Sequence, residues 1–187
     1  MPILAITEFF AFNEKILYRL SDGCAVELKE SDIDVVNELY DQIEDMYPEA
    51  FKSLSDIYKS SCANVPYFRF LCVRRFLKCN YGEIDEKRDV VAGQLANLEI
   101  VKCPLRGECT VEGIVCKPRF SRSLSAAEHR VMKLWFDGAD EAEIADAVFL
   151  SPVTVHNHIA RSYKKLNVHS RAEFVKFAVE HNIFSNG

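Results

Sequence analysis

Long hydrophobic runs, a basic leader and a positive net charge are all missing from this sequence. No apolar stretch of the 187-residue chain approaches the roughly 18 to 20 apolar residues that a membrane-spanning helix needs. The first residues, MPILAITEFFAFNEK, show neither the basic segment nor the small-residue cleavage site of a secretory signal peptide. We therefore expect a cytoplasmic protein with no membrane partner. With 49% hydrophobic and 27% charged residues, the composition is that of a globular chain.

Charge is distributed unevenly along the chain. The formal net charge is −5, yet residues 119–187 carry nine basic side chains against eight acidic ones. From Ser151 to Arg171 the sequence has four basic side chains, three histidines and no acidic side chain. A short basic segment inside an acidic protein is the electrostatic footprint expected of a nucleic-acid contact, and the whole-chain charge conceals it.

Cysteine and histidine divide the chain at the same place. All seven cysteines precede residue 118, and all five histidines follow it. An odd number of cysteines in a chain expected in a reducing compartment argues against a disulfide scaffold. The basic, proline-containing link from Lys117 to Arg122 separates the two compositions. We therefore predict one domain over residues 1–118 and a second over residues 119–187.

Helix-start signals recur four times in the second domain. Three are capping boxes, in which the first side chain and a glutamate three residues later cap the helix; they begin at Ser125, Asp140 and Ser170. The fourth is Ser151, which is followed by proline in the first helical position. Gly138 stands where the first helix needs a left-handed residue. The third helix, predicted over Pro152–Leu166, has apolar residues at helical spacing, namely Val155, Ile159, Tyr163 and Leu166.

The opposite face of this third helix is polar and basic. Its residues are His156, Asn157, Ala160, Arg161, Lys164 and Lys165. The three-residue turn from Phe149 to Ser151 joins it to the short preceding helix. Two short helices around a tight turn, the second one basic on its outer face, are typical of a helix-turn-helix. In that motif the second helix enters the major groove of double-stranded DNA, where its N-terminal side chains reach base edges.

With these features, the segment from Leu124 to Ile183 resembles the LuxR/GerE-type DNA-binding domain of bacterial transcription regulators. Matching positions occur along the whole segment: Leu124, Glu128, Val131, Gly138, Glu143, Ile144, Ala145, Leu150, Ser151, Thr154, Val155, His158, Lys165, Leu166, Val168, Ser170, Arg171, Ala172 and Glu173. The resemblance covers about the last third of the chain. It implies a four-helix domain with a recognition helix in the major groove. It also implies dimerisation through the last helix.

The sequence departs from the family pattern on the face that would contact bases. His156 stands where the family often has lysine, and Ala160 stands at a position that can be basic. We therefore expect DNA binding, but not an operator sequence shared with relatives. Asn157 matches the donor and acceptor of adenine. The predicted DNA-binding residues are Ser151, Thr154, His156, Asn157, Arg161, Lys164 and Lys165, the last three as phosphate contacts.

The last predicted helix has more apolar residues than one small domain needs to cover itself. They are Phe174, Val175, Phe177, Ala178 and Val179. Bacterial half-sites are commonly contacted by symmetric dimers. We therefore expect a homodimer through this helix.

Three helices are predicted in the first domain from the spacing of its apolar residues. We expect them over Asp32–Tyr47, Glu49–Ser61 and Tyr67–Lys78, followed by a short strand over Leu95–Lys102. Such a domain lacks the alternating strands and helices of a phosphoacceptor receiver domain. It also lacks the tryptophans expected of an acyl-homoserine-lactone sensor, because the single Trp lies in the second domain. Both sensor types are therefore disfavoured.

Cysteines gather at the end of the first domain. Three lie in a glycine-containing segment and a fourth ends the third predicted helix, with the spacing C-x23-C-x5-C-x6-C; they are Cys79, Cys103, Cys109 and Cys116. Four thiolates can surround a tetrahedral zinc ion, and a site made of cysteine alone leaves no position for a reactive water. We therefore predict a structural zinc site. An iron–sulfur cluster and unligated thiols are the alternatives.

The three remaining cysteines are not predicted to be first-choice metal ligands. Cys72 lies seven residues before Cys79 on the same predicted helix, so it is the substitute ligand. Cys24 and Cys62 are predicted to be ordinary buried thiols, because free cysteine is among the most buried residue types.

No motif points to catalysis. The sequence has no glycine-rich phosphate loop, no nucleophile elbow and no deaminase zinc signature, so we predict that the protein is not an enzyme. A sigma-factor-like protein and an adaptor acting through a protein partner of the first domain are the alternative functions, with RNA polymerase as a candidate partner. The extra helix after the recognition helix and the cysteine group argue against the sigma-factor alternative.

Taken together, these patterns predict a mostly α protein with two domains. The first is helical and ends in a cysteine-rich, metal-binding loop region. The second is a four-helix LuxR-type helix-turn-helix domain. The predicted function is sequence-specific DNA binding in transcription regulation, with double-stranded DNA as the partner.

Overall fold

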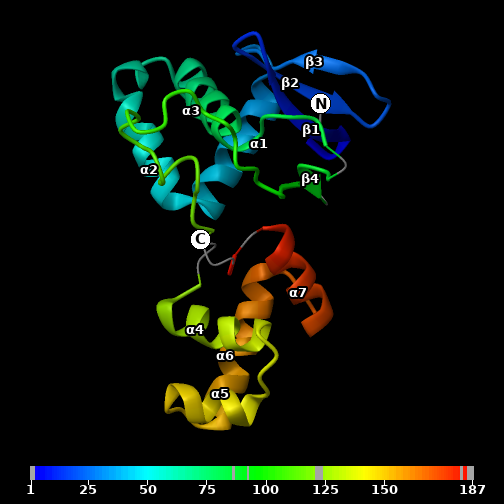
Figure 1. Cartoon of the computed structure of the whole chain (residues 1–187), viewed down its shortest axis with the longest axis vertical. Coiled ribbons are helices and arrows are strands. Elements are labelled where there is room, and N and C mark those ends of the chain that lie inside the picture. Colours follow the sequence, from blue (N-terminus) through cyan, green and yellow to red (C-terminus); the bar gives the residue numbers. More distant parts are fainter. Residues whose placement is uncertain (1–2, 86, 92, 121–123, 182, 185–187) are drawn as a thin grey trace. The chain divides into compact units, whose positions relative to one another are not determined.

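The chain folds into two units, Met1–Phe120 and Ser121–Gly187, and each is described by itself. A computed structural model describes residues 3–85, 87–91, 93–120, 124–181 and 183–184 (Figure 1). The division falls two residues beyond the predicted boundary at residue 118. Residues 121–123, at the end of the predicted link, lie outside the described residues. Within the described part of the chain, no helix combines the length and the apolar character needed to cross a membrane.

The first unit begins with a β-sheet that the sequence analysis did not predict. Strands β1 (Ile6–Phe12), β2 (Lys15–Leu20) and β3 (Ala25–Glu27) pair antiparallel in the order β1-β2-β3. The two residues between β1 and β2, Asn13 and Glu14, both have positive φ, as a two-residue type I′ hairpin requires. The sequence analysis predicted no strand in this segment, so the expectation of a helical first domain is wrong here.

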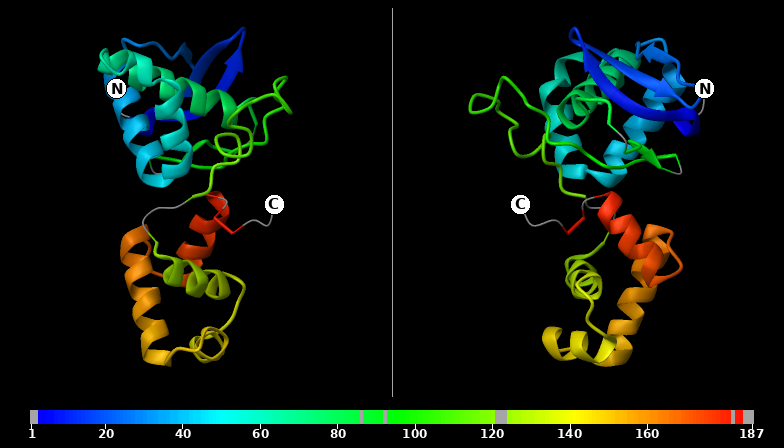
Figure 2. Two further views of the ribbon diagram at one scale, coloured as in Figure 1. Left: turned by 90° about the vertical axis from the view of Figure 1, so that its left-hand side faces the viewer. Right: turned by 45° about the vertical axis from the view of Figure 1, so that its right-hand side comes forward.

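Alternating burial explains why β2 is a strand. Ile16, Tyr18 and Leu20 are buried, while the residues between them are more exposed. A period of two places these three side chains on one face, which packs on the helices of the unit (Figure 2). The apolar residues of the helices have a longer period, so a search for helical spacing passes over this segment.

Three helices follow, close to their predicted positions. They are α1 (Ile33–Met46), α2 (Pro48–Ile57) and α3 (Val65–Asn80), and a 3₁₀ turn, η2 (Lys59–Ser61), follows α2. Asn64 caps α3 by accepting the Tyr67 N–H, so this helix begins two residues earlier than predicted. Their core centres on Tyr47, which is fully buried and whose ring lies 5.2 Å from that of Phe76 and 5.9 Å from that of Phe120.

A small hairpin follows α3. Strands β4 (Val90–Val91) and β5 (Gln94–Leu95) pair antiparallel. The predicted strand over Leu95–Lys102 is wrong, because only its first residue is in a strand. The side chain of Gln42 on α1 fixes the hairpin by donating to the Gly93 carbonyl at 2.7 Å and accepting the Leu95 N–H at 2.9 Å. After Leu95 the chain runs without helix or strand to Phe120.

Asp89 connects this hairpin to the first strand. Its carboxylate accepts the Phe9 N–H at 2.7 Å, and its own N–H donates to the Thr7 carbonyl at 2.9 Å. Only 2% of the residue is exposed. The pKa of the Asp89 carboxyl is raised from 3.8 to about 8, mainly by burial and further by the charges of Glu99 and Glu8. The hydrogen bond from the Phe9 N–H lowers this pKa but does not outweigh burial.

The second unit contains four helices. They are α4 (Ala126–Phe136), α5 (Glu141–Val148), α6 (Pro152–Leu166) and α7 (Arg171–Glu180). Helix α6 packs on both α4 and α5, and α7 packs on α4. The fully or nearly fully buried apolar side chains come from all four helices: Val131, Met132, Ile144, Ala145, Val155, Phe174 and Ala178. The predicted mostly α fold is confirmed in this unit.

The raised pKa of Asp89 gives the first unit a defined pH dependence. Between the unfolded value of 3.8 and the folded value of about 8, the folded protein holds the Asp89 proton more tightly than the unfolded chain does. Its free energy of unfolding should therefore fall as pH rises through this window. Asp89→Asn keeps an oxygen for the Phe9 N–H and cannot titrate, so urea unfolding of this variant should vary less with pH. The exposed Asp41→Asn is the control, and identical pH curves for Asp89→Asn and wild type would contradict the assignment.

Candidate nucleic-acid interface and cysteine cluster

Capping interactions build the helix-turn-helix from the sequence upward. At α5, Asp140 accepts the Glu143 N–H, and Glu143 accepts the Asp140 N–H in return, which confirms the predicted capping box. The helix ends at Phe149, whose φ of 57° is left-handed. Ser151 then caps α6 by accepting the Thr154 N–H at 3.2 Å. The turn between the two helices is therefore fixed at both ends.

The other two predicted capping boxes differ from each other. The box at Ser125 is complete, with reciprocal bonds between Ser125 and Glu128. Ser170 accepts the Glu173 N–H, but the Glu173 carboxylate accepts the His169 N–H. The second half of this box is thus shifted back by one residue.

The inner face of α6 is anchored by apolar side chains. Val155, Ile159 and Leu166 are buried, as predicted. The fourth fully buried position is Ser162, whereas Tyr163 is half-buried. The Tyr163 hydroxyl accepts a hydrogen bond from the indole N–H of Trp135 on α4 at 2.9 Å. Tyr163 therefore contacts α4 with its polar end and is not fully enclosed in the core.

The outer face of α6 is solvent-exposed along its whole length. The exposed predicted residues are Ser151, His156, Asn157, Arg161, Lys164 and Lys165, while Thr154 is half-buried. The structure adds Val153, which is 71% exposed at the start of α6 and which the sequence analysis did not include. The only signal in the sequence was an apolar residue beside Pro152, outside the apolar spacing of the helix.

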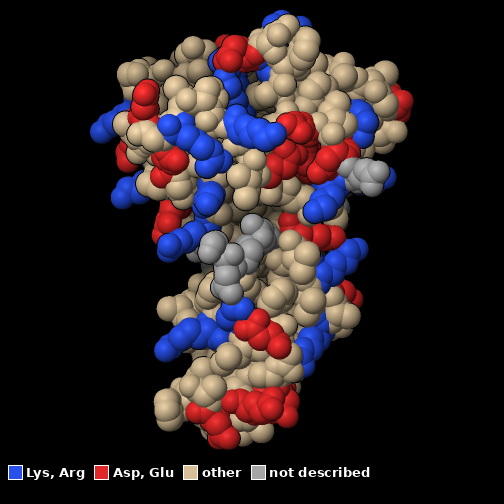
Figure 3. Space-filling model, in the orientation of Figure 1, with Lys and Arg blue, Asp and Glu red and all other residues tan. Residues whose placement is uncertain are grey.

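A hydrogen bond connects this face to α5. The Nδ1 atom of His156 lies 3.0 Å from Glu141 Oε1, which holds the imidazole beside the first turn of α5. Acidic side chains gather over α5 in the space-filling view, away from the basic side chains of the unit (Figure 3). The surface of α5 is therefore acidic, in contrast to the outer face of α6.

Lys165 differs from its neighbour Lys164 in having a partner inside the unit. Its ammonium lies 2.7 Å from Oε2 of Glu128 on α4, and the Glu128 side chain is only 6% exposed. Burial alone would raise the pKa of the Glu128 carboxyl. Hydrogen bonds from Lys165 and Ser125 outweigh that cost, and the pKa lies below 4.5. This half-buried ion pair joins the end of α6 to the start of α4.

Residues 122–178 match the family model described as bacterial regulatory proteins, luxR family. The second unit carries a luxR-type domain. No curated protein and no solved structure matches the chain. The match supports a DNA-binding transcription regulator. The resemblance drawn from the sequence is confirmed for this unit.

Arg171 fixes α7 in the luxR-type domain. Its guanidinium donates to the carbonyls of Trp135 at 2.7 Å and Ala139 at 3.0 Å, and it stacks 4.0 Å from the centre of the Trp135 ring. The arginine thus joins α7 to the last turn of α4 and to the loop that follows it. Trp135 is half-buried under this cation.

The apolar residues of α7 have two different environments. Phe174 and Ala178 are buried in the core of the luxR-type domain. Val175 and Phe177 are half-buried, the Phe177 ring lies 4.2 Å from that of His181, and Val179 is 62% exposed. Phe174 and Ala178, two of the five residues predicted at a dimer interface, therefore pack inside the unit.

The seven cysteines fall into three groups. Cys24 and Cys62 are exposed, so the prediction that they are buried is wrong. Cys72 is buried, and burial raises its pKa to about 12. The four predicted metal ligands, Cys79, Cys103, Cys109 and Cys116, are all half-buried.

Those four cysteines share one region of the first unit. Burial raises the pKa of the Cys79 thiol, the charges of Cys116, Cys103 and Cys109 raise it further, and Arg75 lowers it. Charges act in this way only over short distances, so the other three side chains lie near Cys79. Among the described residues, no three His, Cys, Asp or Glu side chains lie close enough to hold one metal ion.

Removing the ammonium of Lys165 should destabilise the luxR-type domain. Lys165→Met leaves the buried Glu128 carboxylate without its cation, at a cost of about 1 to 3 kcal/mol in the free energy of unfolding. Lys164→Met removes the same charge from an exposed neighbour and should change stability by less than about 0.5 kcal/mol. Urea unfolding of the two variants measures the difference, and equal stabilities would contradict it.

The same ion pair predicts an acid dependence. The pKa of Glu128 is lower in the folded protein than its ordinary value of 4.5. Its contribution to the free energy of unfolding is therefore fully present above pH 4.5 and is lost as pH falls through the folded pKa. Glu128→Gln should therefore lose less stability than wild type when the protein is acidified.

Proposed function

We propose that the luxR-type domain binds double-stranded DNA in a sequence-specific manner, with α6 in the major groove, and that the protein regulates transcription. The observation that supports this most directly is the exposed outer face of α6. It carries cations, histidine and asparagine and no carboxylate, although the chain as a whole is acidic. A helix with this face fits the width of the major groove.

The two ends of the exposed face have different chemistry. The first turns present Val153, His156 and Asn157, and the later turns present Arg161 and Lys164. Recognition helices reach base edges with their N-terminal residues, and cations further along contact phosphates. In this arrangement Asn157 pairs with adenine, and Val153 contacts a thymine methyl group.

Most residues of this face make no contact that holds the described part of the unit together; His156, which bonds Glu141 on α5, and Lys165 differ from the rest. Val155, Ile159 and Ser162 lie on the opposite side and hold α6 against the unit. Lys165 has the stronger structural role of the two, because its ammonium bonds the buried Glu128 carboxylate. The role of Lys165 as a phosphate contact stays a prediction, and Lys164 is the better residue with which to test phosphate binding.

Two substitutions on α6 should have different effects on DNA binding. Lys164→Ala removes a phosphate contact, so affinity should fall for all duplexes and the salt dependence should flatten by about one unit of slope. Asn157→Ala removes a base contact and should cost about 1 to 3 kcal/mol of discrimination at one base pair. Fluorescence anisotropy with selected and scrambled duplexes measures both quantities at several salt concentrations.

The control is Arg130→Ala, which removes an exposed cation from α4 of the same unit and should leave both quantities unchanged. An unchanged salt dependence in Lys164→Ala would contradict the proposed orientation of α6. A chain that binds RNA polymerase but no duplex would favour the sigma-factor-like alternative.

We further propose that two chains bind one operator through α7. Val179 is 62% exposed on this helix and Val175 is half-buried, so an apolar strip remains after Phe174 and Ala178 have entered the core. A symmetric dimer presents two recognition helices to two half-sites on the duplex.

A charge placed on this strip should weaken self-association. Val179→Asp should raise the dissociation constant of the dimer in sedimentation equilibrium and should lower affinity for a two-half-site duplex, without unfolding the domain. Phe149→Asp also places a charge at an exposed apolar position, because Phe149 is 94% exposed, and it should leave self-association unchanged. One chain per operator for the wild type, with a single half-site footprint, would exclude the dimer.

A further inference from the structure

We propose that Cys79, Cys103, Cys109 and Cys116 form one thiolate site in the first unit, and that this site binds an iron–sulfur cluster. The proposal is independent of DNA binding by the luxR-type domain. Three contacts bring the four cysteines together, although the sequence separates the first from the last by 36 intervening residues.

The first contact joins the end of α3 to the end of the loop. The amide of Asn80 is fully buried and donates to the Val115 carbonyl at 2.9 Å. Val115 is itself buried, with 1% exposure. Because Asn80 follows Cys79 and Val115 precedes Cys116, this one hydrogen bond places the two outermost cysteines of the set beside each other.

The second contact joins α3 to the middle of the loop. Arg75 lies four residues before Cys79, so both side chains project from the same side of α3. Its guanidinium donates to the Cys109 sulfur at 3.6 Å. Cys109 is thereby held against the helix face that carries Cys79.

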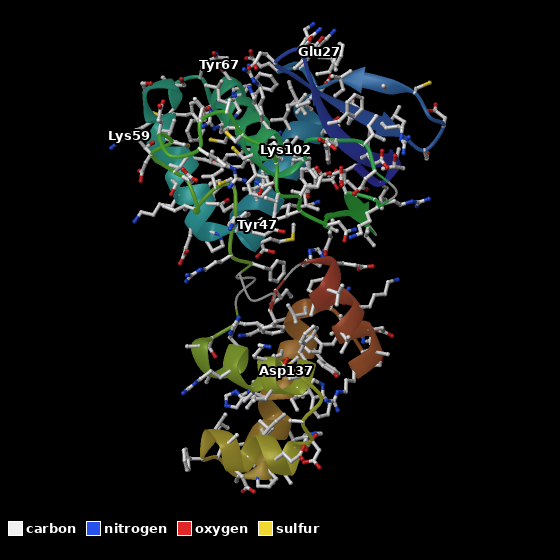
Figure 4. All side chains as sticks on the ribbon, viewed as in Figure 1. Glu27, Tyr47, Lys59, Tyr67, Lys102 and Asp137 are labelled. Atoms are coloured by element: carbon white, nitrogen blue, oxygen red, sulfur yellow. The ribbon has the colours of Figure 1, made fainter. Side chains whose placement is uncertain are left out.

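The third contact is a shared cavity. Arg75, Cys79 and Cys103 line the same cavity, whose volume is about 430 Å³. Sulfur atoms lie beside α3 in the same part of the unit as Lys102, the residue before Cys103 (Figure 4). Two of the four cysteines therefore line a cavity beside the last turns of α3, and the first two contacts bring Cys109 and Cys116 to the same end of the helix.

Positive groups around the sulfurs suit a negatively charged centre. The Arg75 guanidinium donates to Cys109, and the backbone N–H of Gly113 donates to the Cys116 sulfur at 3.3 Å. Hydrogen bonds to cysteine sulfurs are among the features that tune iron–sulfur clusters. Four neighbouring thiolates would repel one another because each carries a negative charge. Bound metal ions compensate these charges, and the thiols release their protons when the metal binds.

The separation of the cysteines favours a cluster over a single zinc ion. Zinc holds its thiolates at about 2.3 Å and so draws four sulfurs tightly together. In the described part of the chain, no three ligand side chains lie close enough for one ion. An iron–sulfur cluster places iron and sulfide atoms between the cysteines, which keeps their sulfurs further apart. A set made of cysteine alone is also the usual ligand set for such clusters.

The composition of the wild-type protein is the first test. The full chain should be expressed and purified without oxygen, and iron, acid-labile sulfide and zinc should be measured per chain. The expected result is a brown protein with visible absorbance and with iron and sulfide in equal amounts. A colourless protein with one zinc ion per chain would overturn the cluster, and a protein without metal would overturn the site.

Single substitutions then assign the ligands. Cys103→Ser and Cys109→Ser should lose the iron and the visible absorbance, whereas Cys24→Ser and Cys62→Ser, at exposed cysteines, should keep both. If a ligand variant fails to fold, reconstitution of metal-free wild-type protein with ferrous iron and sulfide replaces it. Recovery of the absorbance supports the site, and no recovery in a folded protein overturns it. Equal iron in all four variants would also overturn it.

Discussion

The buried amide of Asn80 is the constraint on which the irregular part of the first unit depends. It donates to the Phe76 carbonyl within α3 and to the Val115 carbonyl at the far end of the loop, both at 2.9 Å. The Asn80 carbonyl in turn accepts the Glu99 N–H. Residues 96–120 have neither helix nor strand, so they take their position from contacts of this kind. The proposed cysteine site is one consequence, because its outermost members flank this hydrogen bond.

The luxR-type domain separates stabilising contacts from contacts available to DNA. Apolar burial and the Arg171 contacts with the end of α4 lie on the inner side of the helices, whereas the Glu128–Lys165 ion pair joins a buried carboxylate to a lysine of the exposed face of α6. The outer face of α6 is left to polar and basic side chains. Substitutions on the two sides should therefore have separate effects, the first on stability and the second on affinity.

The sequence predicted the second unit better than the first. Capping boxes, Ser151-Pro152 and the period of α6 are local signals, and local interactions decide where these helices begin and end. The sheet of β1, β2 and β3 was missed because its strands depend on pairing with each other and on burial against helices that come later in the chain. The pairing of Lys165 with Glu128, 37 residues apart, was likewise invisible to local patterns.

By itself, the sequence determined the division of the chain, the helices of the luxR-type domain and the basic face of α6, because each depends on residue type and short-range spacing. Only the tertiary structure decided which residues on those helices remain exposed. It placed Phe174 and Ala178 in the core, left Val153 and Val179 at the surface, and gathered four cysteines around the end of α3. These outcomes depend on contacts between segments distant in the chain, and such contacts leave no local pattern to detect.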